Sequence, residues 1–135
     1  EGFDPSDGLL QLAREQMPEA SFKVADALSY DYPKDVDLYF AFASLLHVNR
    51  DDLKQVFEKT HDSLNPNGIF YISLKERDGY TEERQEDKFG TRMFYYYNPQ
   101  LIEKIAGTAF STVFEDHQTI GSTNWFTIAL QKQKV

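Results

Sequence analysis

The spacing of hydrophobic and polar positions in the first third of the chain predicts one helix and two strands. Ser6 is a suitable N-cap, and apolar residues follow it at helical spacing as far as Met17, so this segment predicts a helix. Residues 22–25 predict a short strand and residues 26–35 a loop. The apolar run in residues 37–43 is typical of a strand covered on both faces of a parallel sheet.

The middle of the chain continues the alternation of helices and strands. Asn49 caps a helix with one apolar face, and the turn at residues 65–68 separates that helix from a buried strand at residues 69–74. Asn98 begins a third helix, with proline in its first turn, and Gly107 is placed to end it. The order of elements therefore predicts an α/β fold.

Three later segments are strands or loops by their patterns. Residues 110–114 and 124–131 alternate as an antiparallel pair, joined near Gly121. Residues 75–88 are charged without periodicity, which predicts a mobile surface loop, with a lid over a site as the alternative. The aromatic run at residues 93–97 is either a strand packed on the sheet or an aromatic wall around a ligand. Its three tyrosines cannot all face inward, so at least one hydroxyl points elsewhere.

Composition narrows the class of protein. A length of 135 residues suits one domain, residues 1–135, and the formal net charge of -8 argues against nucleic acid or an anionic membrane as partner. The absence of cysteine excludes disulfides, thiolate metal sites and thiol nucleophiles, and favours a reducing compartment. No apolar run is long enough to span a bilayer, so we expect a cytoplasmic protein. The three histidines are too scattered for a metal site, and none is expected.

Polar residues follow three of the predicted strands, where open α/β sheets form their ligand crevice. Asp4 follows the strand remnant that opens the chain, Asp26 follows the next strand, and Ser44 and His47 follow the third. One carboxylate can accept hydrogen bonds from both ribose hydroxyls and a second from the adenine amine, so the two acids suggest a nucleoside. Asp4 also fits a turn residue, and His47 fits a packed or capping histidine as well as a general base.

The order and spacing of several motifs carry a resemblance over nearly the whole chain. The motifs are Gly2-Phe3-Asp4-Pro5-Ser6, Ala25-Asp26-Ala27, Asp37-Leu38 leading to Leu45-Leu46-His47-Val48, and Leu64-Asn65-Pro66-Asn67-Gly68-Ile69. They resemble the successive motifs of class I S-adenosylmethionine-dependent methyltransferases. The resemblance implies a Rossmann-like, mostly parallel sheet with a C-terminal antiparallel hairpin.

The resemblance also implies which residues hold the cofactor, S-adenosylmethionine. Asp4 would hold the ribose and Pro5 would lie against adenine. Asp26 would accept from the adenine amino group, and the N–H of Ala27 would face a ring nitrogen.

Further residues would surround the reacting methyl group. Phe42, Ala43 and Ser44 would border the methionine part, and His47 would stand near the acceptor pocket as the candidate catalytic residue. Three looser candidates for contact with a small-molecule acceptor are Lys75, Tyr95 and Tyr97.

One motif of the family is missing from this chain. Its glycine-rich cofactor loop follows a first strand that would precede Glu1, and no Gly-x-Gly occurs here. We therefore expect an N-terminally truncated sheet without the first strand and helix, and weak or absent cofactor binding by this chain alone. The exposed ladders would be covered by a strand of the intact gene product or by a second copy in a homodimer, or the remaining strands would close into a smaller sheet. The alternative function is a non-catalytic interaction or dimerisation module.

Overall fold

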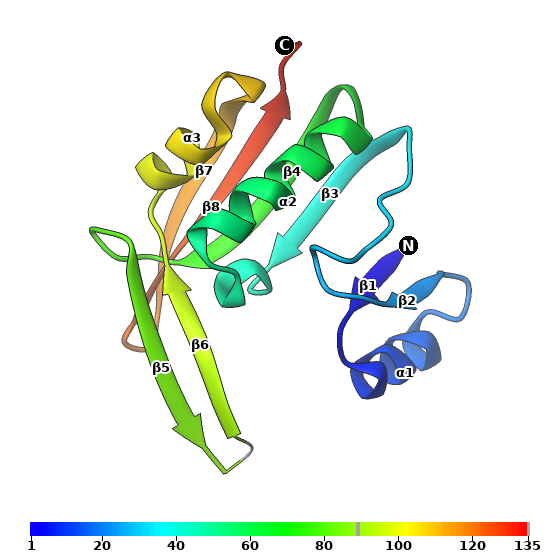
Figure 1. Cartoon of the computed structure of the whole chain (residues 1–135), viewed down its shortest axis with the longest axis horizontal. Helices are drawn as coiled ribbons and strands as arrows, with labels where there is room; N and C mark the ends of the chain where they lie inside the picture. The colour runs from blue at the N-terminus through cyan, green and yellow to red at the C-terminus, as the bar shows by residue number, and fades with distance from the viewer. Residues whose placement is uncertain (89, 135) are drawn as a thin grey trace. The chain divides into compact units, whose positions relative to one another are not determined.

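The protein forms the helices and strands labelled in Figure 1, in a computed structural model that describes residues 1–88 and 90–134. The chain divides into two compact units, Glu1–Tyr32 and Pro33–Val135. We describe each unit by itself.

The first unit is a small β-α-β motif. Strand β1 (Gly2–Asp4) pairs in parallel with β2 (Phe22–Val24), and helix α1 (Asp7–Gln16) connects them. The predicted cap is confirmed, because the Ser6 hydroxyl accepts a hydrogen bond from the N–H of Leu9 at 3.3 Å. All three elements lie where the sequence predicts them.

The second unit is built on a four-stranded sheet with the order β3-β4-β8-β7. Strand β3 (Val36–Phe42) is parallel to β4 (Leu64–Lys75), whereas β8 (Thr123–Lys132) is antiparallel to both β4 and β7 (Phe110–Ile120). The predicted C-terminal antiparallel hairpin is therefore confirmed.

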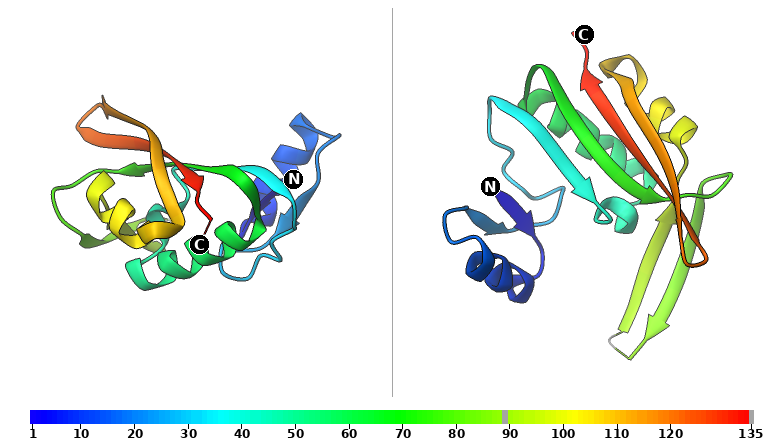
Figure 2. Two further views of the ribbon diagram at one scale, coloured as in Figure 1. Left: turned by 90° about the horizontal axis from the view of Figure 1, so that it is seen from above. Right: turned by 180° about the vertical axis from the view of Figure 1, so that it is seen from behind.

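Two helices cover one face of this sheet, as Figure 2 shows from above. Helix α2 (Arg50–Ser63) begins at Asn49, whose side chain accepts from the N–H of Asp52, and α3 (Pro99–Ala106) begins at the N-cap Asn98. Short 3-10 turns precede α2 (Leu45–His47, η1) and follow α3 (Gly107–Ala109, η2). The core between helices and sheet includes buried side chains from α2, β4 and β8: Leu53, Val56, Phe57, Phe70, Ile72, Leu74, Phe126, Ile128 and Leu130.

The opposite face of the sheet carries exposed aromatic side chains. Phe40 is 68% exposed and Phe42 51% exposed, both on the edge strand β3. Their rings begin a row of contacts that crosses the sheet, from Phe42 to Tyr71 at 5.1 Å and from Tyr71 to Phe114 at 6.0 Å. No helix of the second unit's described residues covers this row.

The segment predicted as a mobile loop is instead half of a β-hairpin. Strand β5 (Thr81–Asp87) pairs antiparallel with β6 (Gly90–Tyr96), and the hairpin extends away from the main sheet in Figure 1. The prediction of a loop was wrong because charged and polar side chains, and not an apolar face, make the contacts of this strand. Glu83 bonds to Arg77 at 2.9 Å and accepts from the Tyr96 hydroxyl at 3.1 Å, and no local apolar alternation reports these contacts.

The strands that were expected to lose a common neighbour belong to separate sheets. Among the described residues, β1 pairs only with β2 and β3 pairs only with β4. Of the three outcomes considered, closure of the remaining strands into one smaller sheet is not observed. Each of these strands therefore keeps one edge without a strand partner.

Candidate functional site

Asp4 and Asp26 leave neighbouring parallel strands at the same edge. Asp4 is aligned with Val24 in the ladder, and the N–H of Ala25 donates to the carbonyl oxygen of Asp4 at 3.1 Å. Two residues beyond Val24, Asp26 begins the following loop. The carboxyl ends of adjacent parallel strands are where α/β sheets bind nucleotides, so the structure brings these two predicted residues together.

Each carboxylate also organises the turn that follows it. Asp4 Oδ1 accepts from the N–H of Ser6 at 2.8 Å, so the turn interpretation of Asp4 is correct as far as this oxygen is concerned. Asp26 Oδ1 accepts from the N–H groups of Leu28 and Ser29, at 2.9 and 2.8 Å. These bonds fix the orientation of both side chains on a rigid backbone.

Asp4 retains capacity to bind a ligand. Its Oδ2 forms no hydrogen bond with residues 1–88 or 90–134, and the neighbouring Pro5 is exposed. A carboxylate oxygen accepts two hydrogen bonds, which matches the two hydroxyls of a ribose. The donor and acceptor chemistry at this edge therefore fits the nucleoside part of S-adenosylmethionine.

In the second unit, the end of β3 has an unusual backbone. Ala43 has φ 57°, in the left-handed region, while its N–H donates to the carbonyl oxygen of Ser73 at 3.0 Å. This conformation costs a non-glycine residue about 1 kcal/mol or more and is concentrated at functional sites. It separates the exposed Phe42 from Ser44, whose side chain makes no capping bond to the following 3-10 turn.

His47, the last residue of that turn, is held by the hairpin. Its Nδ1 lies 2.9 Å from the carbonyl oxygen of Met93, and its ring centroid lies 4.7 Å from that of Phe94. Because a carbonyl oxygen only accepts, Nδ1 carries the proton in this bond and Nε2 of the neutral ring keeps its lone pair. His47 is an exposed residue that this bond and the ring contact hold on one side, and the same geometry leaves Nε2 available for the role of general base.

Lys75, the last residue of β4, contacts the same Phe94 ring. Its Nζ lies 4.5 Å from the centroid of the Phe94 ring and 5.8 Å from that of Trp125. His47 and Lys75, predicted separately from the sequence, thus contact the same buried phenyl ring.

The two candidate tyrosines have different environments. Tyr97 is fully buried, its hydroxyl donates to the carbonyl oxygen of Val48 at 2.7 Å, and burial raises the pKa of this hydroxyl. It supports the site from within the core and does not present its hydroxyl to a ligand. Tyr95 is half-buried and its ring lies parallel to that of Tyr80, with centroids 6.4 Å apart. Tyr80 in turn carries the guanidinium of Arg50 over its ring at 4.6 Å.

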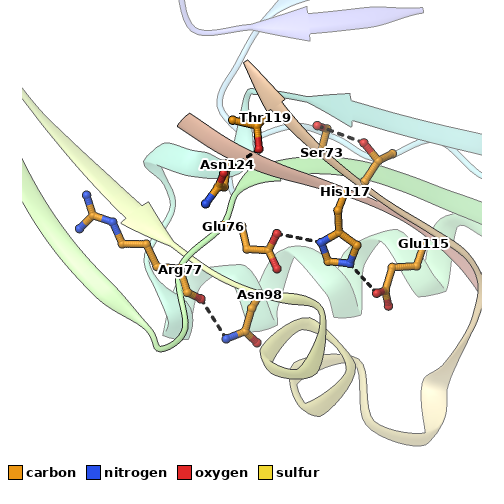
Figure 3. A network of polar contacts seen from close by, with 9 residues as sticks. Ser73, Glu76, Arg77, Asn98, Glu115, His117, Thr119 and Asn124 are labelled. Atoms are coloured by element: carbon orange, nitrogen blue, oxygen red, sulfur yellow. Dashed lines mark hydrogen bonds and ion pairs between the residues drawn. The ribbon is translucent and has the colours of Figure 1, made fainter. Parts of the chain in front are cut away.

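One polar cluster, shown in Figure 3, was not predicted. His117 on β7 bonds through Nδ1 to Glu76 at 2.8 Å and through Nε2 to Glu115 at 2.7 Å, and these two carboxylates raise the pKa of the imidazole. Glu115 and His117 alternate along one strand, which is a weak sequence signal. Glu76 belongs to a distant segment and only the sheet register reveals it.

A neighbouring set of hydrogen bonds joins the segment that precedes β5 to the hairpin and to the N-cap of α3. Hydrogen bonds from Gln85 and Arg77 lower the pKa of Glu83 to about 2. The side chain of Asn98 donates to the carbonyl oxygens of Arg77 and Asp78, at 3.1 and 2.8 Å.

The fold, with acidic residues at the ends of adjacent parallel strands, is typical of nucleotide-binding α/β proteins, and comparison with known proteins identifies the family of this chain. The profile of the methyltransferase domain family matches residues 1–68. The chain therefore belongs to the methyltransferase domain family, as a class I methyltransferase whose cofactor is S-adenosylmethionine, as the resemblance implied. None of the curated protein sequences matched the chain.

Solved structures show the same fold. An S-adenosylmethionine-dependent methyltransferase of Methanosarcina mazei is 15% identical with a TM-score of 0.79, and the match covers 97% of this chain and 80% of that one. A Mesorhizobium loti methyltransferase is 16% identical with a TM-score of 0.76, covering 97% and 79%. The 1,6-didemethyltoxoflavin-N1-methyltransferase of Burkholderia thailandensis, solved with 1,6-didemethyltoxoflavin and S-adenosylhomocysteine, is 18% identical with a TM-score of 0.68, covering 95% and 57%.

None of the helices in the described residues is long and apolar enough to cross a bilayer.

Proposed function

We propose that this chain is part of an S-adenosylmethionine-dependent methyltransferase that acts on a small molecule. It carries the nucleoside-binding residues Asp4 and Asp26, together with residues that contact the methyl acceptor. The observation that carries the proposal is the placement of Asp4 and Asp26 after neighbouring parallel strands, with Asp4 Oδ2 available to a ligand. Support for a small acceptor comes from the net charge of -8, which disfavours a nucleic acid.

In the proposed cofactor site, Asp4 accepts from the ribose hydroxyls and Pro5 lies against the adenine. Asp26 accepts from the adenine amine beside the N–H of Ala27. Within the second unit taken by itself, we assign Phe42, Ala43 and Ser44 to the methionine part. The left-handed backbone at Ala43, and the Ser44 hydroxyl that caps no helical turn, support this assignment.

When bound, S-adenosylmethionine would supply an electrophilic methyl group on a sulfonium for a nucleophilic atom of the acceptor. This chain's own residues then have two tasks. The hairpin and Phe94 orient the acceptor, and His47 Nε2 takes the proton that the acceptor nucleophile releases.

Binding by the 135-residue chain is expected to be weak, because no Gly-x-Gly turn is present to approach the methionine end of the cofactor. The alternative, a non-catalytic module, has no specific observation in its favour. Tyr97 is left out of the acceptor contacts because its hydroxyl is committed to Val48.

The test is the melting temperature of the chain with and without millimolar S-adenosylhomocysteine. We expect a rise for the wild type, because a ligand that binds only the folded state stabilises it. The rise should be lost in Asp4→Ala and retained in Asp31→Ala, an exposed acid of the same unit. An equal rise in Asp4→Ala would contradict the proposal, and a dissociation constant in the micromolar range would contradict the expectation of weak binding.

A further inference from the structure

Lys75 is a half-buried cation without a counter-ion. Its side chain forms no ion pair and no hydrogen bond with residues 1–88 or 90–134, although the chain holds 22 acidic residues against 14 basic ones. The arginines nearby differ, because Arg77 pairs with Glu83 at 2.9 Å and Arg92 with Asp87 at 3.0 Å.

Two aromatic rings take the place of a carboxylate around this ammonium. Lys75 and Trp125 are aligned in the ladder between β4 and β8, so their side chains leave the same face of the sheet. The Nζ lies 4.5 Å from the centroid of Phe94 and 5.8 Å from that of Trp125. Ring faces attract a cation but replace only part of its lost hydration.

An anion beside Lys75 would gain an ion pair that is shielded from water on two sides. Phe94 is buried, whereas Trp125 is partly exposed and offers ring surface to a ligand. A ligand with both a negative charge and a flat apolar ring matches this combination better than a charged or an apolar ligand alone.

The position relative to His47 ties this anion site to the acceptor. His47 packs on the same Phe94 ring at 4.7 Å. A ligand that spans from Lys75 past Phe94 therefore places its far end beside the imidazole.

We propose that Lys75 and Trp125 form the binding site for the carboxylate and ring of an aromatic carboxylate, and that the methyl acceptor belongs to this chemical class. The identification of this ligand as the methyl acceptor rests on the proposed function, whereas binding of an anion at Lys75 does not require the cofactor. A carboxylate could also come from the methionine part of the cofactor, and the test separates these two sources.

The test uses the fluorescence of Trp125, the only tryptophan in the chain. We expect benzoate to quench it saturably and benzamide, its neutral counterpart, to bind at least about tenfold more weakly. Lys75→Met should lose the preference for benzoate, Lys75→Arg should keep it, and Lys104→Met, an exposed lysine on α3, should match the wild type. Circular dichroism checks that each variant is folded. If Lys75→Met does not fold, the preference of Lys75→Arg for benzoate over benzamide still tests the proposal.

Equal binding of benzoate and benzamide by the wild type, or an unchanged preference in folded Lys75→Met, would overturn the proposal. A Lys75→Met variant that keeps its benzoate affinity and loses S-adenosylhomocysteine binding would assign the lysine to the cofactor, and would also overturn it. Asp4→Ala should bind benzoate as the wild type does. Loss of nucleoside binding and loss of anion binding at Lys75 therefore give different results.

Discussion

His47 donates a hydrogen bond from Nδ1 to the backbone carbonyl oxygen of Met93, at 2.9 Å, across 46 positions of sequence. This bond links the turn after β3 to the hairpin strand β6 and selects one tautomer of the ring. The lone pair on Nε2 is thereby directed away from the hairpin backbone.

The tautomer of His47 is directly measurable. We expect heteronuclear NMR at neutral to mildly basic pH to show the Nδ1–H form, because Nδ1 faces a carbonyl oxygen. His61 is the internal control, since its Nε2 lies 3.0 Å from the carbonyl oxygen of Gln133 and should give the opposite tautomer. A protonated Nε2 in neutral His47 would remove it as a candidate base.

Tyr97→Phe should destabilise the second unit. The substitution removes the only hydroxyl bonded to the Val48 carbonyl oxygen in the described residues and leaves a polar group poorly satisfied, at a cost of about 1 to 3 kcal/mol in the free energy of unfolding. Tyr95→Phe is the matched control and should change it little, because Tyr95 is only half-buried. Urea denaturation measures both, and equal effects would refute the assignment of Tyr97 to the core.

The cluster around His117 predicts a pH-dependent contribution to stability. Because Glu115 and Glu76 raise the pKa of the folded-state imidazole above its ordinary value, the folded protein binds the proton more tightly than the unfolded chain. The stabilisation is therefore fully present below a pH of about 6.5 and is lost as the pH rises through the folded-state pKa.

His117→Gln tests this dependence. The difference in melting temperature between the wild type and the variant should be larger near pH 6 than near pH 9, at a fixed salt concentration. A difference that is constant, or that grows with pH, would show that the carboxylates do not hold the protonated ring.

In residues 1–88 and 90–134, β3 pairs with a strand on one edge only and carries exposed apolar side chains, which predicts self-association of this chain. Unpaired strand edges with apolar side chains favour pairing between copies, and we propose a homodimer through this edge. Sedimentation should show association that Phe40→Lys weakens and that Leu12→Lys, at an apolar and exposed position on α1, leaves intact. A monomer at all concentrations, or equal effects of both substitutions, would refute the dimer.

Helix boundaries and most of the succession of elements along the chain were predictable because their signals are local. The helices are capped by side chains that accept from backbone N–H groups three positions further on. These residues are Ser6, Asn49 and Asn98, and each is a preferred N-cap type directly before a helical pattern. The strand ends at Asp4 and Asp26 follow from the same local patterns.

The remainder depends on register and distant contacts. The pairing of Lys75 with Trp125, and the contact of both His47 and Lys75 with Phe94, arise from strands that meet only in the folded sheet. The left-handed backbone of Ala43 has no signature, because alanine does not favour that conformation. The hairpin was missed for a different reason, since β5 consists of charged and polar residues and shows no apolar alternation.

The most direct test of nucleoside binding by Asp4 and Asp26 is to measure which backbone amide NMR resonances change when S-adenosylhomocysteine is added. The account predicts the largest changes at Asp4 to Ser6 and at Ala25 to Ser29, the two strand ends with their turns. Changes confined to other parts of the first unit or to the helical face of the second, with these two segments unaffected, would contradict it.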